Sequence, residues 1–160
     1  MSFKTLFLLI IVFLLSCNSG DNSDNHLTFK GSDINGVKFN SKEFEGTPMI
    51  INFWYPSCPP CTKEIPTLVE FNKENNQKIL MIGIIHNSLV DSKEDAISML
   101  EKFDVEYINL YDKDNSLTEE FNILGFPTTI FLDKTHKVNT KWTGYLDENT
   151  LKKESSKISK

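Results

Sequence analysis

Two cysteines three positions apart, Cys58 and Cys61, are the residues whose types and spacing most directly suggest chemistry. A thiolate attacks a disulfide, and a second thiol nearby can resolve the mixed disulfide that results. The pair follows a short apolar run at 49–54 and opens a segment at about 59–75 with helical periodicity. A helix N-terminus stabilises a thiolate through its dipole and its free N–H groups. We therefore predict that Cys58 is the exposed, attacking thiol and that Cys61 is the more buried, resolving thiol.

The two residues between the cysteines, Pro59 and Pro60, bear on how reducing the pair is. If Cys58 is the N-cap of the helix, its sulfur accepts hydrogen bonds from the backbone N–H groups that follow it. Proline has no N–H, so only the N–H of Cys61 could donate. A thiolate with fewer hydrogen bonds is less stable, which makes the couple more reducing.

Other uses of two cysteines at this spacing are open at this point. Two thiolates are half of a zinc site. The chain has no second cysteine pair, however, and its three histidines lack ligand spacing: His26, His86 and His136. We therefore predict no metal and no other cofactor. A static structural disulfide is the remaining alternative, although an exposed helix N-terminus suits such a bond poorly.

The hydrophobic pattern predicts the elements that would position the cysteines. The apolar runs 49–54 and 79–85 are typical of buried parallel strands. Further predicted elements are strands at 107–110, 128–132 and 137–142 and helices at 59–75, 91–103, 116–122 and after Asp147. Strands that alternate with helices imply an α/β fold with a central mixed sheet flanked by helices.

Local signals predict where some of these elements begin. Asp91 with Glu94, and Ser116 with Glu119, have the spacing of a capping box at the start of a helix. Upstream, Asn35-Gly36 lies between apolar residues and predicts a β-hairpin before the first buried strand.

A second motif, Gly125-Phe126-Pro127-Thr128, precedes the strand predicted at 128–132. Together with Trp54-x-x-x-Cys58-x-x-Cys61 and Pro66 in the following helix, it resembles the thioredoxin superfamily over about residues 45–157. The resemblance implies that Pro127 is a cis proline beside the active disulfide and that the backbone of Phe126 pairs with the substrate. It also implies a substrate-binding surface formed by Trp54, Phe126 and Pro127.

A narrower resemblance is to the TlpA/ResA/CcmG group of membrane-anchored thiol–disulfide oxidoreductases. It rests on the N-terminal hairpin, on a helix and strand inserted between 85 and 126, and on Glu64 three residues after Cys61. One turn past Cys61 on the same helix face, a partly buried Glu64 could exchange protons with the resolving thiol. Asn52 stands where thioredoxin has a titrating Asp. The alternative is a solvated glutamate that the helix dipole favours near the N-terminus.

The first residues of the chain have the pattern of a targeting segment. Residues 1–16 combine one lysine with an apolar run too short to span a bilayer, and they end in Leu14-Leu15-Ser16-Cys17. This ending resembles the bacterial lipobox, which implies cleavage before Cys17 and its lipidation. The alternative is a short anchor that is never cleaved. We expect residues 17–26 to form a lipidated N-terminus and flexible tether, and 27–160 to form one thioredoxin-like domain.

Composition and resemblance together limit the function. A net charge of −5 and the lack of arginine argue against binding to nucleic acid. The prediction is a monomeric, lipid-anchored oxidoreductase that faces the periplasm or exterior. Its partners would be client proteins with disulfides or thiols, of the cytochrome c maturation type, and a membrane electron donor.

Three other functions are weighed against this prediction. A net oxidase or isomerase would use the same cysteine pair. Thioredoxin-fold copper carriers use a Cys-x-x-x-Cys motif with a distant histidine, which is one residue longer than the spacing here. Peroxidases of this fold use a Thr or Ser three residues before the attacking cysteine, and this chain has Tyr55 at that position.

Overall fold

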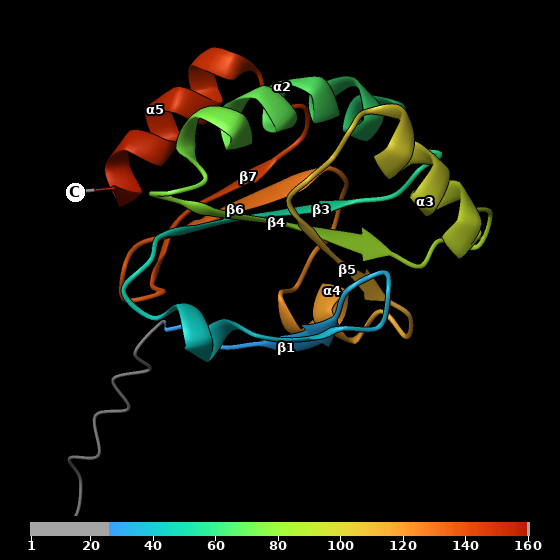
Figure 1. The fold of residues 1–160 in the computed structure, drawn as a ribbon, viewed down its shortest axis with the longest axis horizontal. Coiled ribbons are helices and arrows are strands. Elements are labelled where there is room, and N and C mark those ends of the chain that lie inside the picture. The colour runs from blue at the N-terminus through green and yellow to red at the C-terminus, as the bar shows by residue number, and fades with distance from the viewer. Residues whose placement is uncertain (1–25, 160) are drawn as a thin grey trace, which may run out of the picture.

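The computed structural model describes residues 26–159, which form a sheet with helices on both faces (Figure 1). The five strands, in the order β5-β4-β3-β6-β7, are Ile108–Asp112, Leu80–His86, Met49–Trp54, Thr128–Leu132 and Val138–Thr143. β3 pairs with β4, and β4 with β5, in parallel, whereas β3–β6 and β6–β7 are antiparallel. The predicted mixed sheet is therefore confirmed. The predictions for Cys17, for the leader and for the tether up to residue 25 lie outside the described residues.

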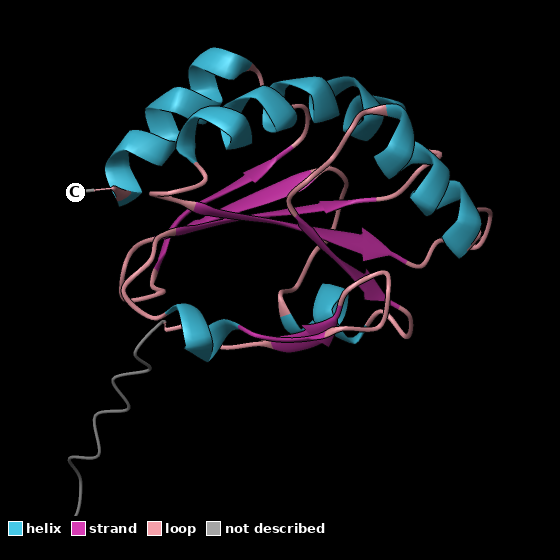
Figure 2. Cartoon of the chain, in the orientation of Figure 1, coloured by secondary structure: helices cyan, strands magenta, loops and turns pink. Residues whose placement is uncertain are grey.

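The two faces of the sheet carry different elements (Figure 2). One face is covered by α2 (Pro59–Asn75), α3 (Lys93–Lys102) and α5 (Glu148–Ile158). The other carries α4 (Ser116–Glu120), the 3-10 helix η1 (Ser41–Phe44) and a hairpin of β1 (Lys30–Ser32) and β2 (Lys38–Asn40). Since both faces are covered, β3 is buried at all six positions, as its continuous apolar sequence predicts.

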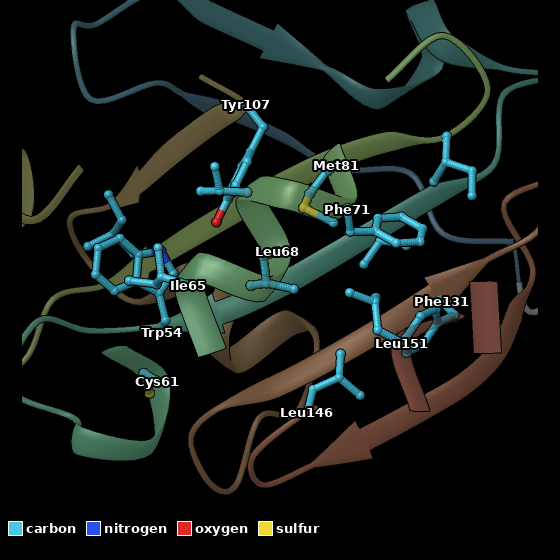
Figure 3. Packing of buried hydrophobic residues seen from close by; sticks show 14 of the residues in the cluster. Trp54, Cys61, Ile65, Leu68, Phe71, Met81, Tyr107, Phe131, Leu146 and Leu151 are labelled. Atoms are coloured by element: carbon cyan, nitrogen blue, oxygen red, sulfur yellow. The ribbon is translucent and has the colours of Figure 1, made fainter. Parts of the chain in front are cut away.

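The core on the α2 side includes both cysteines of the motif. Ile65, Leu68 and Phe71 from α2 pack there with Phe131 of β6 and Leu151 of α5 (Figure 3). The helix α2 runs for seventeen residues, beginning directly after Cys58 and including Cys61 in its first turn. This packing fixes α2 against the sheet and so fixes the position of its first turn.

The N-terminal hairpin forms as predicted, but its turn is longer than an Asn-Gly pair. The last paired residues are Ser32 and Lys38, and the Asp33 carboxylate accepts hydrogen bonds from the N–H groups of Asn35 and Val37. Gly36 takes the left-handed conformation, with φ of 89°, that this loop requires.

Two predicted helix starts are wrong, for the same physical reason. Ser92 and Asp95, rather than Asp91 and Glu94, form the capping box of α3, because the Asp91 carboxylate is bound to two serine hydroxyls elsewhere. A capping box needs its side chain free to face the helix, and tertiary contacts can take that side chain away.

At the start of α4, the Ser116 hydroxyl is bound to the nearby Asp114 carboxylate at 2.7 Å and does not cap the helix. In place of a Ser116–Glu119 box, the Asp112 carboxylate at the end of β5 accepts hydrogen bonds from the N–H groups of Leu117 and Thr118. At α5 the prediction holds, since Asp147 accepts from the N–H of Thr150.

Candidate active site

The two cysteines form a disulfide at the N-terminus of α2. Their Cα atoms are 5.2 Å apart. Cys58 is the extended N-cap residue, Pro59 and Pro60 occupy the first two helical positions, and the Cys61 N–H lies 3.3 Å from the Cys58 sulfur. The expected geometry, with one backbone donor to this sulfur from the first turn of α2, is present.

The predicted exposure of Cys58 is wrong for this disulfide form. Cys58 is 2% exposed and Cys61 is 0% exposed, so both belong to the core cluster. Two half-buried aromatic side chains, Tyr55 and Phe126, pack against that cluster. Because these two residues lie far apart in the sequence, linear motifs did not reveal that they pack on the same cluster.

The Phe126–Pro127 peptide bond is cis, in agreement with the family resemblance. The Phe126 ring contacts the rings of Tyr55 and His86, with centroid distances of 5.2 and 4.7 Å. Tyr55 is itself tied to the motif, because its carbonyl accepts the Cys58 N–H at 3.2 Å. The fold thus joins the Phe126–Pro127 loop to the segment that enters the disulfide, and it adds His86, which sequence patterns did not single out for this site.

Trp54 differs from its predicted place on the substrate-binding surface. Its side chain is 1% exposed and lies in the core with Ile65 (Figure 3). The indole N–H donates to Asn109 Oδ1 at 3.2 Å, across the sheet in β5. Trp54 therefore supports the end of β3 from within, because a tryptophan ring at this inward-facing position fills the space between β3, β5 and α2.

Glu64 is fully buried, so the solvated alternative is excluded. Its two carboxylate oxygens accept hydrogen bonds from Asn52 Nδ2 and from the Leu146 N–H, both at 2.8 Å. Burial raises the Glu64 pKa from 4.5 to about 7, against the opposing effect of these two hydrogen bonds. The pKa of the buried Tyr107 is also raised, first by desolvation and then by the charge of Glu64.

The network around Glu64 reaches three separate parts of the fold. Asn52 in β3 also donates to Thr129 Oγ1 in β6 at 3.0 Å, and Leu146 precedes α5. Asn52 thus holds Glu64, which is a role that its position in the sequence did not indicate. A side chain that titrates near pH 7, one turn along α2 from Cys61, is suited to accept and return a proton during thiol chemistry.

Within residues 26–159, no three His, Cys, Asp or Glu side chains come together as a group that could hold a metal ion. The same part of the chain contains no helix of the length and apolarity needed to cross a membrane.

Known proteins with a similar sequence include thiol–disulfide oxidoreductases, in agreement with a redox-active cysteine pair. The family model described as Redoxin matches residues 22–157. The chain belongs to the Redoxin family. One relative of this Redoxin chain is ResA of Bacillus thuringiensis subsp. konkukian, which is named a thiol-disulfide oxidoreductase. The two sequences are 26% identical over 131 residues, which cover 81% of this chain and 74% of ResA.

A second relative and a solved structure are also similar to this chain. The thioredoxin-like protein YneN of Bacillus subtilis is 26% identical over 66% of this chain, and the match spans 62% of YneN, less than two thirds of its length. The crystal structure of a secreted disulfide oxidoreductase from Mycobacterium tuberculosis shares the fold, with a TM-score of 0.73 and 22% identity over 81% of this chain and 96% of that one. The buried disulfide at a helix N-terminus, in a chain of this family, is the redox centre of a thiol–disulfide oxidoreductase.

Proposed function

We propose that this oxidoreductase is a lipid-anchored, extracytoplasmic reductant of protein disulfides, of the kind that serves cytochrome c maturation. The proposal for its location rests on the leader and on Leu14-Leu15-Ser16-Cys17, and the proposal for its clients rests on the resemblance to the TlpA/ResA/CcmG group. Its electrons would come from a membrane partner that reduces Cys58–Cys61 after each turnover.

The observation that carries the reducing direction is the set of donors at the Cys58 sulfur. The first two helical residues are prolines, and the Cys61 N–H at 3.3 Å is the donor that this turn supplies. A helix start without prolines would offer further N–H groups to the same sulfur. The thiolate is therefore less stabilised, and a less stabilised thiolate passes its electrons on more readily.

The reaction follows from the order of the two thiols. The Cys58 thiolate attacks one sulfur of a client disulfide, forms a mixed disulfide, and expels the other client sulfur as a thiolate, which takes up a proton. The Cys61 thiol then gives its proton to Glu64 and attacks the Cys58 sulfur. This step releases the second client thiolate, which is protonated in turn. Two electrons have passed to the client, and Cys58–Cys61 is again a disulfide.

The test of this assignment is to trap the intermediate. The Cys61→Ala variant should accumulate mixed disulfides through Cys58 with a disulfide-containing client, because the resolving thiol is gone, whereas Cys58→Ala should accumulate none. Non-reducing electrophoresis and mass spectrometry of the linked peptides measure both. Equal trapping by the two variants would show that the roles of attacker and resolver are assigned wrongly.

The anchor is tested separately. In bacterial cells, Cys17→Ser should release the protein from membranes or leave its leader uncleaved. A processed Cys17→Ser protein that remains in the membrane fraction would refute lipidation at this residue without affecting the thiol chemistry.

A further inference from the structure

The loop that follows β4 is tied to the residue directly before the disulfide. Asp91 Oδ2 accepts a hydrogen bond from the Ser57 hydroxyl at 2.8 Å and another from the Ser88 hydroxyl at 2.6 Å. The Asp91 N–H in turn donates to Ser88 Oγ at 3.1 Å. These bonds hold the carboxylate in one place, although Asp91 is only half-buried and Ser57 is exposed.

This carboxylate lies one hydrogen bond from the neighbour of Cys58. Ser57 and Cys58 are adjacent residues, so the carboxylate is bonded to the direct sequence neighbour of the thiol. At 0.1 M salt, charges act on one another over roughly 10 Å. A groove of about 290 Å³ runs between this segment and α3, and its lining includes Pro56, Ser57, Asp91 and Met99.

The other charged groups of that groove are engaged elsewhere. Asp95 accepts the capping hydrogen bonds of Ser92 at the start of α3. The Lys102 ammonium lies over the Phe103 ring, 5.3 Å from its centroid. On the other side of the motif, Glu64 faces Asn52 and Leu146. His86 lies against the rings of Tyr55 and Phe126. Asp91 is thus the carboxylate that is bonded to the segment entering Cys58.

The Ser57–Asp91 bond has two consequences for a thiolate on Cys58. The Ser57 hydroxyl donates its hydrogen to Asp91, so this hydrogen does not stabilise the cysteine sulfur. A fixed negative charge nearby also disfavours a second negative charge at Cys58. Both effects act in the same direction as the missing N–H groups of Pro59 and Pro60.

We propose that Asp91 is a positioning residue that holds Ser57 and, through its charge, disfavours the thiolate form of Cys58, which makes the couple more reducing. The inference rests on the proposed function only in taking Cys58 as the attacking thiol. It concerns the difference between wild type and variants, and not the direction in which the wild type works.

The decisive variant is Asp91→Asn, which keeps the shape and an acceptor for the serine hydroxyls but removes the charge. The pH dependence of alkylation of Cys58 in the reduced protein, followed by mass spectrometry of its peptide, measures the thiol pKa. We expect this pKa to fall by about one unit in Asp91→Asn, which corresponds to about tenfold more thiolate at neutral pH. The same tenfold change should make the potential about 30 mV less reducing in a glutathione titration.

Three further variants separate charge from structure. Asp91→Glu should restore the wild-type thiol pKa, because it keeps the charge. Glu94→Gln removes an exposed charge from the first turn of α3. It should change the thiolate population of Cys58 at neutral pH by less than about threefold. Ser57→Ala should shift it less than Asp91→Asn does, since Ser88 still holds the carboxylate.

An unchanged pKa of Cys58 in Asp91→Asn, or equal shifts in Asp91→Asn and Glu94→Gln, would overturn the proposal. Equal shifts in Ser57→Ala and Asp91→Asn would overturn the role of the charge. None of these outcomes bears on client trapping by Cys61→Ala, so failure here is distinguishable from failure of the proposed function.

Discussion

Two carboxylates flank the Cys58–Cys61 motif, and they differ in burial and in the groups that donate hydrogen bonds to them. Glu64 is fully buried and accepts hydrogen bonds from an amide and a backbone N–H. Asp91 is half exposed and accepts from the hydroxyls of Ser57, in the loop before α2, and of Ser88, in its own loop. Glu64 lies on the helix that carries the resolving thiol, whereas Asp91 contacts the segment that leads to the attacking thiol.

The comparison shows how burial assigns different roles to the same functional group. Desolvation raises the Glu64 pKa to about 7, so this carboxylate can change protonation state near neutral pH. Asp91 keeps contact with water and, in our proposal, acts through its charge beside the segment that enters Cys58. One group moves protons for Cys61, and the other biases the ionisation of Cys58.

The largest expected effect comes from removing the titration of the buried carboxylate. Glu64→Gln should slow the resolution of mixed disulfides near neutral pH by about 10²-fold or more, the usual contribution of a positioned proton acceptor. Stopped-flow measurement of client release gives this rate, and its pH profile should lose the step near 7. Glu70→Gln is the matched control, because Glu70 is an exposed acid of the same helix that pairs with Lys73. A Glu64→Gln variant with the rate and pH profile of wild type would remove Glu64 from the mechanism.

The second effect is on stability and follows from the same raised pKa. Because the Glu64 pKa is about 7 in the fold against 4.5 when unfolded, the proton binds more tightly to the native state. The stability linked to this proton is present in full below pH 4.5 and is lost as pH rises through 7, a change of about 3 kcal/mol.

Urea unfolding of the oxidised protein at a series of pH values between 4 and 9 measures this change. The free energy of unfolding of wild type should fall with pH relative to that of Glu64→Gln. Parallel curves for the two proteins would show that burial does not perturb this carboxyl group.

The smallest effect concerns salt. An exposed charge is screened over a few ångströms at 1 M salt, whereas a buried group is screened far less. The difference in Cys58 alkylation between wild type and Asp91→Asn should therefore shrink to within about twofold at 1 M sodium chloride. The rate difference caused by Glu64→Gln should persist. If both differences responded equally to salt, the contrast between a buried and an exposed carboxylate would be wrong.

Much of the site could be predicted because its decisive features are local in sequence. A Cys-x-x-Cys pair after an apolar run predicts the helix start, and the two prolines predict which N–H can reach the Cys58 sulfur. The position of Glu64 one turn past Cys61 on the same helix face follows from the helical period. The sequence leaves open whether that residue is buried or solvated. The mixed sheet and its flanking helices follow from the alternation of apolar strands with amphipathic segments.

The features that were not predicted depend on residues far apart in the chain. Cys58 is buried although its position at a helix N-terminus suggested exposure. Tyr55 and Phe126 pack against the cluster that contains it, and they come from different loops. Asp91 does not cap α3, because its partner Ser57 comes from a loop 34 residues earlier. Trp54 lies inside the core, where its indole finds Asn109 in β5. Periodicity and spacing carry no information about such long-range contacts, because these contacts depend on how the strands are ordered in the sheet.

The redox potential of the Cys58–Cys61 couple tests the central claim most directly. Equilibration of the wild-type protein with glutathione buffers, read by mass spectrometry after thiol trapping, measures it. With one backbone donor from the first helical turn at the attacking sulfur, we expect a value nearer the roughly −270 mV of thioredoxin than the roughly −120 mV of DsbA. A value above about −180 mV would contradict the account, because such a couple would oxidise client thiols.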